Sequence, residues 1–239
     1  MIGGVSGDML IGALINLGVS VSELNTSLSL LPLKGLKLTE TYVKRGPLQA
    51  VLAQPVLNNE LLKKRFSWDD FFDLILKSKL DQDVKIKTKK VLERLVEAEV
   101  KIHGGIEKPH ELGSIDTLVD IVSVIMGFKI LEADIIYASP FPFDTGITKT
   151  QHGIVSSLAP ATSEIIASVN APVSQVNTEM NLGELVTPTG AALVTELCVF
   201  EKLNMKLGKL GYGAGQKDPP GFSNVVSIWK GEAKNNEFS

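Results

Sequence analysis

The sequence predicts an α/β fold, a mixed sheet with packed helices, and three observations support this class. Segments with the apolar period of helices alternate along the chain with short segments of alternating or β-branched residues. The 239 residues are 44% hydrophobic, which is enough for a sizeable core. Neither an internal repeat nor a low-complexity linker interrupts the chain, so residues 1–239 are expected to form a single α/β region.

The first half of the chain combines several helix patterns with one pair of strands. Ser6 and Asp8 suit a helix start, because a short polar side chain caps free N–H groups and a carboxylate favours the positive end. Gly18 suits the end of that helix. Residues 37–43 and 49–57 are expected to be strands, paired as a hairpin or as neighbours. The apolar periodicity predicts helices at 6–17, 22–30, 67–76 and 83–102.

The second half alternates short strands with helices around an irregular stretch. Pro140, Pro142 and Gly146 predict irregular backbone up to His152, because proline removes a donor and fixes φ. Helices are expected from about residue 116, at 160–169 and at 187–200. Strands are expected at 134–138, 184–186, 208–214 and 224–229.

The charge and cysteine content exclude several classes of protein. A formal net charge of -3 without a clustered basic excess argues against nucleic-acid binding. Cys198 is the only cysteine, which rules out an internal disulfide and a cysteine-based zinc site. The sequence has neither an apolar run of about 18 residues nor a signal segment. It therefore predicts a cytoplasmic protein that does not associate with a membrane.

One imidazole and three carboxylates are concentrated between residues 110 and 120, at the start of an apolar helix: His110, Glu111, Asp116 and Asp120. Asp116 and Asp120 share a helix face because they are one turn apart. Carboxylates at the edge of a buried helix are costly unless they are paired, hydrogen-bonded or bound to a cation. Mixed nitrogen and oxygen ligands suit a divalent metal. The alternative is that the two aspartates cap and solvate a helix start and that His110 is an ordinary polar side chain.

The other two histidines differ in their setting. His103 stands at a helix C-terminus, where the dipole favours a cationic side chain, so a structural role is expected. His152 follows the irregular stretch and precedes Gly153, where the backbone is free to approach a ligand. His152 is therefore a candidate ligand or catalytic residue.

Three helix starts follow turns that are rich in glycine, threonine or alanine. Free N–H groups and hydroxyls at such starts can hold phosphate or carboxylate groups, although simple capping explains each start as well. None is a Walker A loop, because the Lys-Ser/Thr ending is absent. The candidate phosphate-binding residues are Ser6, Gly7, Thr162, Thr187, Thr189 and Gly190.

Two further patterns lack the context that their chemistry requires. Gly211-Tyr212-Gly213-Ala214-Gly215 resembles a dinucleotide loop, but Pro219 and Pro220 block the helix that should follow. A glycine-rich turn between strands is expected instead. Ser6, Ser114 and Thr189 have no base at a readable spacing, so a covalent hydrolase is not supported.

The order of these motifs along the chain carries a resemblance to a known family. The first two motifs are Gly-Val-Ser-Gly-Asp-Met-Leu-Ile-Gly-Ala-Leu at 4–14 and His-Glu-Leu-Gly-Ser-Ile-Asp-Thr-Leu-Val-Asp-Ile-Val at 110–122. The next is His-Gly at 152–153 together with Ala-Pro-Ala-Thr at 159–162. The last two are Glu-Leu-Val-Thr-Pro-Thr-Gly-Ala-Ala-Leu at 184–193 and Gly-Tyr-Gly-Ala-Gly at 211–215. This succession resembles the nickel-insertion proteins of nickel-pincer cofactor biosynthesis, which place nickel into a pyridinium bis-thiocarboxylate mononucleotide. That product is the cofactor of lactate racemase.

The resemblance implies a CTP-dependent cyclometallase that uses Mn²⁺ or Mg²⁺ with CTP and leaves nickel bound to two sulfurs and one ring carbon. It also implies that CTP is handled by a C-terminal domain. That domain is expected to be absent here and to be supplied by a partner region or a split chain. Two departures from the family pattern stand out. Lys108 replaces a histidine, and Ser156 and Ser157 interrupt a proline-rich run.

The resulting site hypothesis joins the motifs. Nickel, or the nucleotide that receives it, would be held between His110 and His152. Glu111, Asp116 and Asp120 would be oxygen ligands of the metal or would orient His110. The residues that would carry the chemistry are Asp8, His110, Glu111 and His152. The mononucleotide phosphate would bind at the three helix starts. The sequence is also compatible with a homo-oligomer. One alternative is a non-catalytic scaffold that docks a separate CTP-binding domain. A metal-dependent phosphohydrolase is a third reading.

Overall fold

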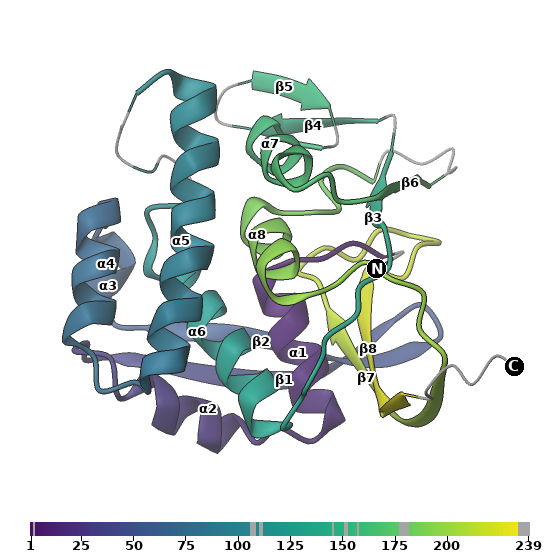
Figure 1. Cartoon of the computed structure of the whole chain (residues 1–239), viewed down its shortest axis with the longest axis horizontal. Helices are drawn as coiled ribbons and strands as arrows, with labels where there is room; N and C mark the ends of the chain where they lie inside the picture. Colours follow the sequence, from purple (N-terminus) through teal and green to yellow (C-terminus); the bar gives the residue numbers. More distant parts are fainter. Residues whose placement is uncertain are drawn as a thin grey trace, which may run out of the picture.

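A four-stranded mixed sheet forms one side of the molecule, and helices cover one of its faces (Figure 1). The computed structural model describes residues 1, 3–105, 109, 112–144, 146–150, 153–156, 158–176 and 182–233. The strand order is β1-β2-β7-β8, formed by β1 (Leu36–Arg45), β2 (Leu48–Leu57), β7 (Met205–Ala214) and β8 (Val225–Ala233). The two hairpins, β1 with β2 and β7 with β8, are antiparallel, and they join in parallel at Val51 and Gly213. The predicted α/β class and both strand pairs are confirmed.

Helix α1 (Gly7–Leu17) lies against the sheet at very close range. A Cβ at Gly213 would overlap the Met9 carbonyl oxygen, and one at Gly211 would overlap the Ala13 carbonyl oxygen. The Gly-Tyr-Gly-Ala-Gly motif thus lies largely within β7, where its missing side chains admit the helix backbone. The expected glycine-rich turn between strands is wrong for this reason.

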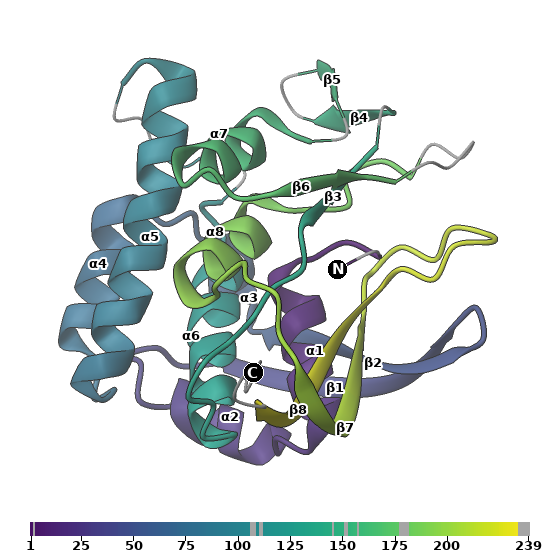
Figure 2. The same cartoon turned by 45° about the vertical axis from the view of Figure 1, so that its right-hand side comes forward.

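The remaining helices pack around α1, with α2 also against β1 (Figure 2). Their buried apolar side chains belong to one continuous core. Fully buried Leu14 of α1 lies directly against Gly127 of α6, where a Cβ would overlap its side chain. This layer contains α2 (Val21–Leu28), α3 (Asn59–Lys63), α4 (Trp68–Lys77), α5 (Gln82–His103), α6 (Ile115–Ile130), α7 (Pro160–Ser168) and α8 (Pro188–Leu197). The expected helices are therefore present with small shifts at their ends, while the short α3 was not predicted.

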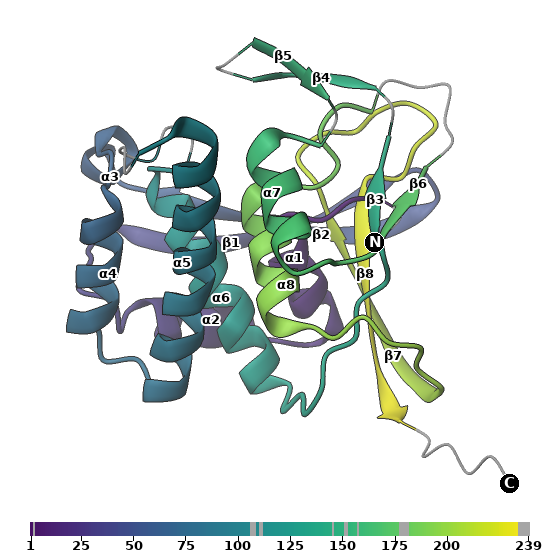
Figure 3. The same cartoon turned by 45° about the horizontal axis from the view of Figure 1, so that its top comes forward.

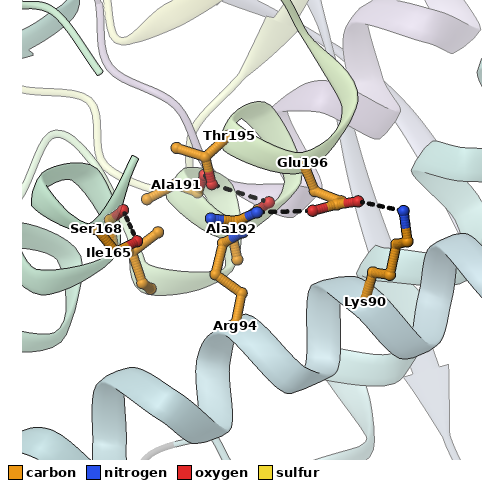
Figure 4. A network of polar contacts seen from close by, with 8 residues as sticks. All are labelled: Lys90, Arg94, Ile165, Ser168, Ala191, Ala192, Thr195 and Glu196. Atoms are coloured by element: carbon orange, nitrogen blue, oxygen red, sulfur yellow. Dashed lines mark hydrogen bonds and ion pairs between the residues drawn. The ribbon is translucent and has the colours of Figure 1, made fainter. Parts of the chain in front are cut away.

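A polar contact ties α5 to α8 across the layer (Figure 4). Arg94 Nη2 lies 2.7 Å from a Glu196 carboxylate oxygen, and Lys90 Nζ lies 3.5 Å from the other oxygen. Thr195 donates to the Ala191 carbonyl within α8. The Arg94 and Glu196 side chains are only 19% and 15% exposed, so this ion pair is shielded from solvent.

The stretches around residues 140 and 185 differ from expectation. Residues 134–138 and 184–186 form no strands, because each makes only a single-residue bridge, Tyr137 to Val199 and Val5 to Val186. The stretch predicted to be irregular contains paired segments instead. These are β3 (Phe141–Phe143) with β6 (Val173–Gln175), in parallel, and β4 (Ile147–Thr150) with β5 (Gly153–Ser156), antiparallel. Helices long and apolar enough to span a membrane do not occur among the described residues.

Candidate functional site

Helices α1 and α8 begin side by side because the segments before them are paired. The Val5 N–H donates to the Leu185 carbonyl over 2.8 Å, and the Thr187 N–H donates to the Val5 carbonyl over 3.1 Å. A Cβ at Gly190 would overlap the Val5 carbonyl oxygen, so α8 starts in direct contact with that segment. Two positive helix ends therefore lie next to one another.

The start of α7 also lies beside the segment that precedes α8. Thr162 is completely buried, and its hydroxyl donates to the Val186 carbonyl over 3.2 Å. This bond ties the first turn of α7 to the segment that precedes α8. The structure thus brings together the three helix starts that the sequence singled out as anion sites.

The hydroxyls at these starts serve mainly internal contacts. Thr187 Oγ1 accepts the Gly190 N–H over 3.1 Å, so Thr187 is the N-cap of α8. Thr189 is buried at 7% exposure. Ser6 does not cap α1, since its hydroxyl donates to an Asp8 carboxylate oxygen instead. At α7 the N-cap position is Ala159, which offers no side-chain oxygen. Backbone N–H groups at α1 and α7 are therefore better anion donors than these hydroxyls.

Three carboxylates gather beside the α1 start: Asp8 from α1, and Asp116 and Asp120 from the first two turns of α6. A Cβ at Gly7 would overlap the Asp120 carboxylate, so that group lies directly against the Gly7 backbone. Only glycine leaves room there. The predicted shared face of Asp116 and Asp120 is thus turned toward the first helix.

Each carboxylate has a different set of hydrogen bonds. Asp8 accepts from the Met9 N–H over 2.9 Å, from Gln216 Nε2 over 3.1 Å and from the Ser6 hydroxyl. Asp116 Oδ2 accepts from the Ser114 hydroxyl over 3.4 Å, while its Oδ1 is buried without a hydrogen-bond partner. Among the described residues this buried oxygen has no partner, which is costly, and a bound cation would relieve that cost.

The electrostatics of the cluster disfavour full ionisation. Burial raises the pKa of Asp120 well above its ordinary value, and the negative charges of Asp8 and Asp116 raise it further. Burial also raises the pKa of Asp116, against the opposing effects of the Ser114 hydrogen bond and of Arg65. A divalent cation nearby would reverse both shifts, because it stabilises the ionised carboxylates.

The predicted nitrogen ligands are not placed by the structure. His110, Glu111 and His152 lie outside the described residues, as does Lys108. Within the described ranges, no group of three or more His, Cys, Asp or Glu side chains has the arrangement of a metal site. The three aspartates therefore do not form a complete cage on their own, and further ligands would have to come from the neighbouring segments. His103 lies 3.7 Å from Glu99 on α5, which agrees with its expected structural role.

Gln216 is a site residue that the sequence did not reveal. Its Nε2 donates to Asp8, while its Oε1 accepts from Gln54 Nε2 over 3.3 Å, so β2, α1 and the segment after β7 are linked. The only sequence signal was its position directly after the glycine motif. A glutamine carries no intrinsic charge, so its role depends on contacts that only the fold creates.

Comparisons with known proteins agree on one family. A family model described as "Nickel insertion protein" matches residues 1–238. A relative from Desulfitobacterium hafniense, named pyridinium-3,5-bisthiocarboxylic acid mononucleotide nickel insertion protein, is 37% identical over 236 residues, which cover 96% of this chain and 56% of the relative. A relative of the same name from Geobacillus kaustophilus is 33% identical over 242 residues, which cover 96% and 58%.

A third relative, from Dictyoglomus thermophilum, is 34% identical over 234 residues, which cover 96% of this chain and 58% of the relative. The chain therefore spans less than two thirds of the length of these relatives. No solved structure matches.

Proposed function

The chain belongs to the nickel insertion protein family, and on that premise we propose that it takes part in inserting nickel into pyridinium-3,5-bisthiocarboxylic acid mononucleotide. Two relatives carry this substrate in their names, which favours nickel insertion over a non-catalytic scaffold. The observation that carries the proposal is the burial of the Asp120 carboxylate against Gly7, beside Asp8 and Asp116.

Nickel, the substrate ion, would be attracted to the concentrated negative charge at this point. Asp116 and Asp120 would supply oxygen ligands, and His110, Glu111 and His152 would complete the set from the segments next to α6 and β5. Nitrogen and oxygen ligands release nickel more readily than a cage of thiolates would, which suits a protein that passes the ion on. The unpartnered Asp116 Oδ1 supports this assignment.

The mononucleotide phosphate would lie at the adjacent helix starts. Gly7 and Thr162 mark the first turns of α1 and α7, whose backbone N–H groups and dipoles favour an anion. The first turn of α8 at Gly190 would add its dipole, because its own N–H is already bonded to Thr187. Ser6, Thr187 and Thr189 would hold those turns in place through their internal contacts rather than donate their hydroxyls to the phosphate. Substrate and metal would then meet at the N-terminus of α1.

Asp8 would act in the chemical step. A product in which nickel is bonded to a ring carbon requires that one ring C–H bond be replaced by a C–Ni bond, so one proton must leave. The Asp8 carboxylate, held in place by Ser6, Met9 and Gln216, would accept that proton. CTP, with Mn²⁺ or Mg²⁺, would be bound by the additional region that the longer relatives contain.

The direct test is product formation. The protein would be incubated with Ni²⁺, Mn²⁺, CTP and the pyridinium mononucleotide, with and without the additional region of the Desulfitobacterium hafniense relative. Mass spectrometry would then measure the mass of the product. We expect a nickel-containing product when both parts are present. No nickel adduct in either mixture, while the full-length relative produces it, would contradict the proposal.

A further inference from the structure

The outer ends of β7 and β8 form a two-stranded ribbon that extends past the helical layer (Figure 3). Residues 205–210 and 229–233 make up this ribbon, and most of them are exposed. Leu207, Leu210 and Trp229 are 47%, 42% and 59% exposed. An isolated two-stranded ribbon with large apolar side chains in water is only marginally stable.

The apolar side chains share the face that is turned away from the core. Gly211 and Gly213 face α1, so Leu210 and its cross-strand partner Trp229 point to the opposite side. Leu207 pairs with Gly231, two residues beyond Trp229, and lies on the same outer face. On the other face, Lys230 Nζ donates to the Leu131 carbonyl at the end of α6 over 2.8 Å. The ribbon thus shows the reverse of the usual pattern, in which the apolar face meets the core.

Strand β8 is also an edge of the sheet. An edge strand offers a row of unpaired backbone N–H and C=O groups to another strand, and proteins commonly block such edges with charges of one sign. The edge of β8 carries Lys230, Gly231 and Glu232 in succession. Opposite charges on the two sides of a glycine do not block the edge against a second copy of itself.

We propose that β8 pairs antiparallel with β8 of a second copy of this chain, about a two-fold axis at Gly231. This register places Lys230 of each copy opposite Glu232 of the other, and Trp229 opposite Ala233. A register centred on Lys230 or on Glu232 would place like charges opposite one another, which is destabilising. The dimer has one continuous eight-stranded sheet, since each copy contributes the order β1-β2-β7-β8.

The charge pattern provides the experiment, which is sedimentation velocity of the full chain over a range of concentrations. Lys230→Glu and Glu232→Lys each place like charges opposite one another at two symmetric positions. We expect each variant to raise the dimer dissociation constant about tenfold or more. The double variant Lys230→Glu/Glu232→Lys restores the pairing and the dimer.

Mixing the two single variants gives a second readout. A Lys230→Glu copy is complementary to a Glu232→Lys copy, so an equimolar mixture forms heterodimers at concentrations where each variant alone is largely dissociated. Trp229→Ser weakens the dimer, whereas Tyr42→Ser, at an equally exposed position on β1, does not. A monomeric wild type, or single variants that associate as strongly as the wild type, would overturn the proposal. Circular dichroism identifies any variant that fails to fold.

Discussion

The Asp120 carboxylate lies against the backbone of Gly7, so the first turn of α1 and the second turn of α6 touch at one partly buried acidic group. Gly7→Ala would place a methyl group where that carboxylate stands. We expect a loss of about 1–3 kcal/mol in the free energy of unfolding, because an overpacked site forces the backbone to shift. Urea denaturation would measure it. Gly105→Ala is the matched control, since a Cβ there meets open space, and equal losses in both variants would contradict the assignment.

The raised pKa of Asp120 makes stability depend on pH in a defined direction. The Asp120 carboxyl titrates at about pH 4 in the unfolded chain and at a higher pH in the folded chain. Between those values the folded state binds more protons than the unfolded state, so stability falls as pH rises through this window. Asp120→Asn should flatten the fall and leave only a smaller slope from Asp116. Metal-free urea denaturation at a series of pH values would test this, and parallel curves for wild type and variant would refute it.

The ion pair between Arg94 and Glu196 should stabilise the helical layer more than an exposed pair does. Glu196→Gln leaves the shielded Arg94 guanidinium without its charged partner, so we expect a loss of about 1–3 kcal/mol. Asp73→Asn removes a pair with Lys77 of the same 2.7 Å separation, but its side chains are 61% and 64% exposed. That control should change stability by less than about 1 kcal/mol. Thermal denaturation of both variants measures the two losses of stability. Similar losses would show that shielding from solvent does not strengthen the Arg94–Glu196 pair.

The hydrogen bond from Gln216 should tune metal binding with little effect on folding. Gln216→Ala removes a donor to Asp8 at an exposed position, so stability should change by less than about 1 kcal/mol. Nickel affinity should fall measurably, because Asp8 loses the contact that holds its negative charge beside the proposed ligand Asp120. Calorimetry of this variant beside Gln54→Ala, which removes only the donor to Gln216, would separate the two contacts. A change in stability without a change in affinity would assign Gln216 a purely structural role.

The sequence predicted most of the helices and both hairpins because their signals are local. Ser67 and Asp70, three residues apart, form the capping pair at the start of α4, and the periodic pattern of α5 matches its observed span. The proximity of Asp8 to the Asp116–Asp120 face was not predictable in this way, since α1 and α6 meet only through the tertiary fold. The same holds for Gln216. Residues 134–138 were mispredicted because a short β-branched run does not reveal whether a partner strand exists.

Nickel titration calorimetry tests the central claim most directly. Wild type would be compared with Asp120→Asn, His110→Ala and His152→Ala. Asp69→Asn and His103→Ala serve as controls that remove a carboxylate and an imidazole from α4 and α5. We expect the first three variants to bind nickel at least about tenfold more weakly and the controls to bind like the wild type. Equal nickel affinity in all six proteins would contradict the assignment of a metal site beside the start of α1.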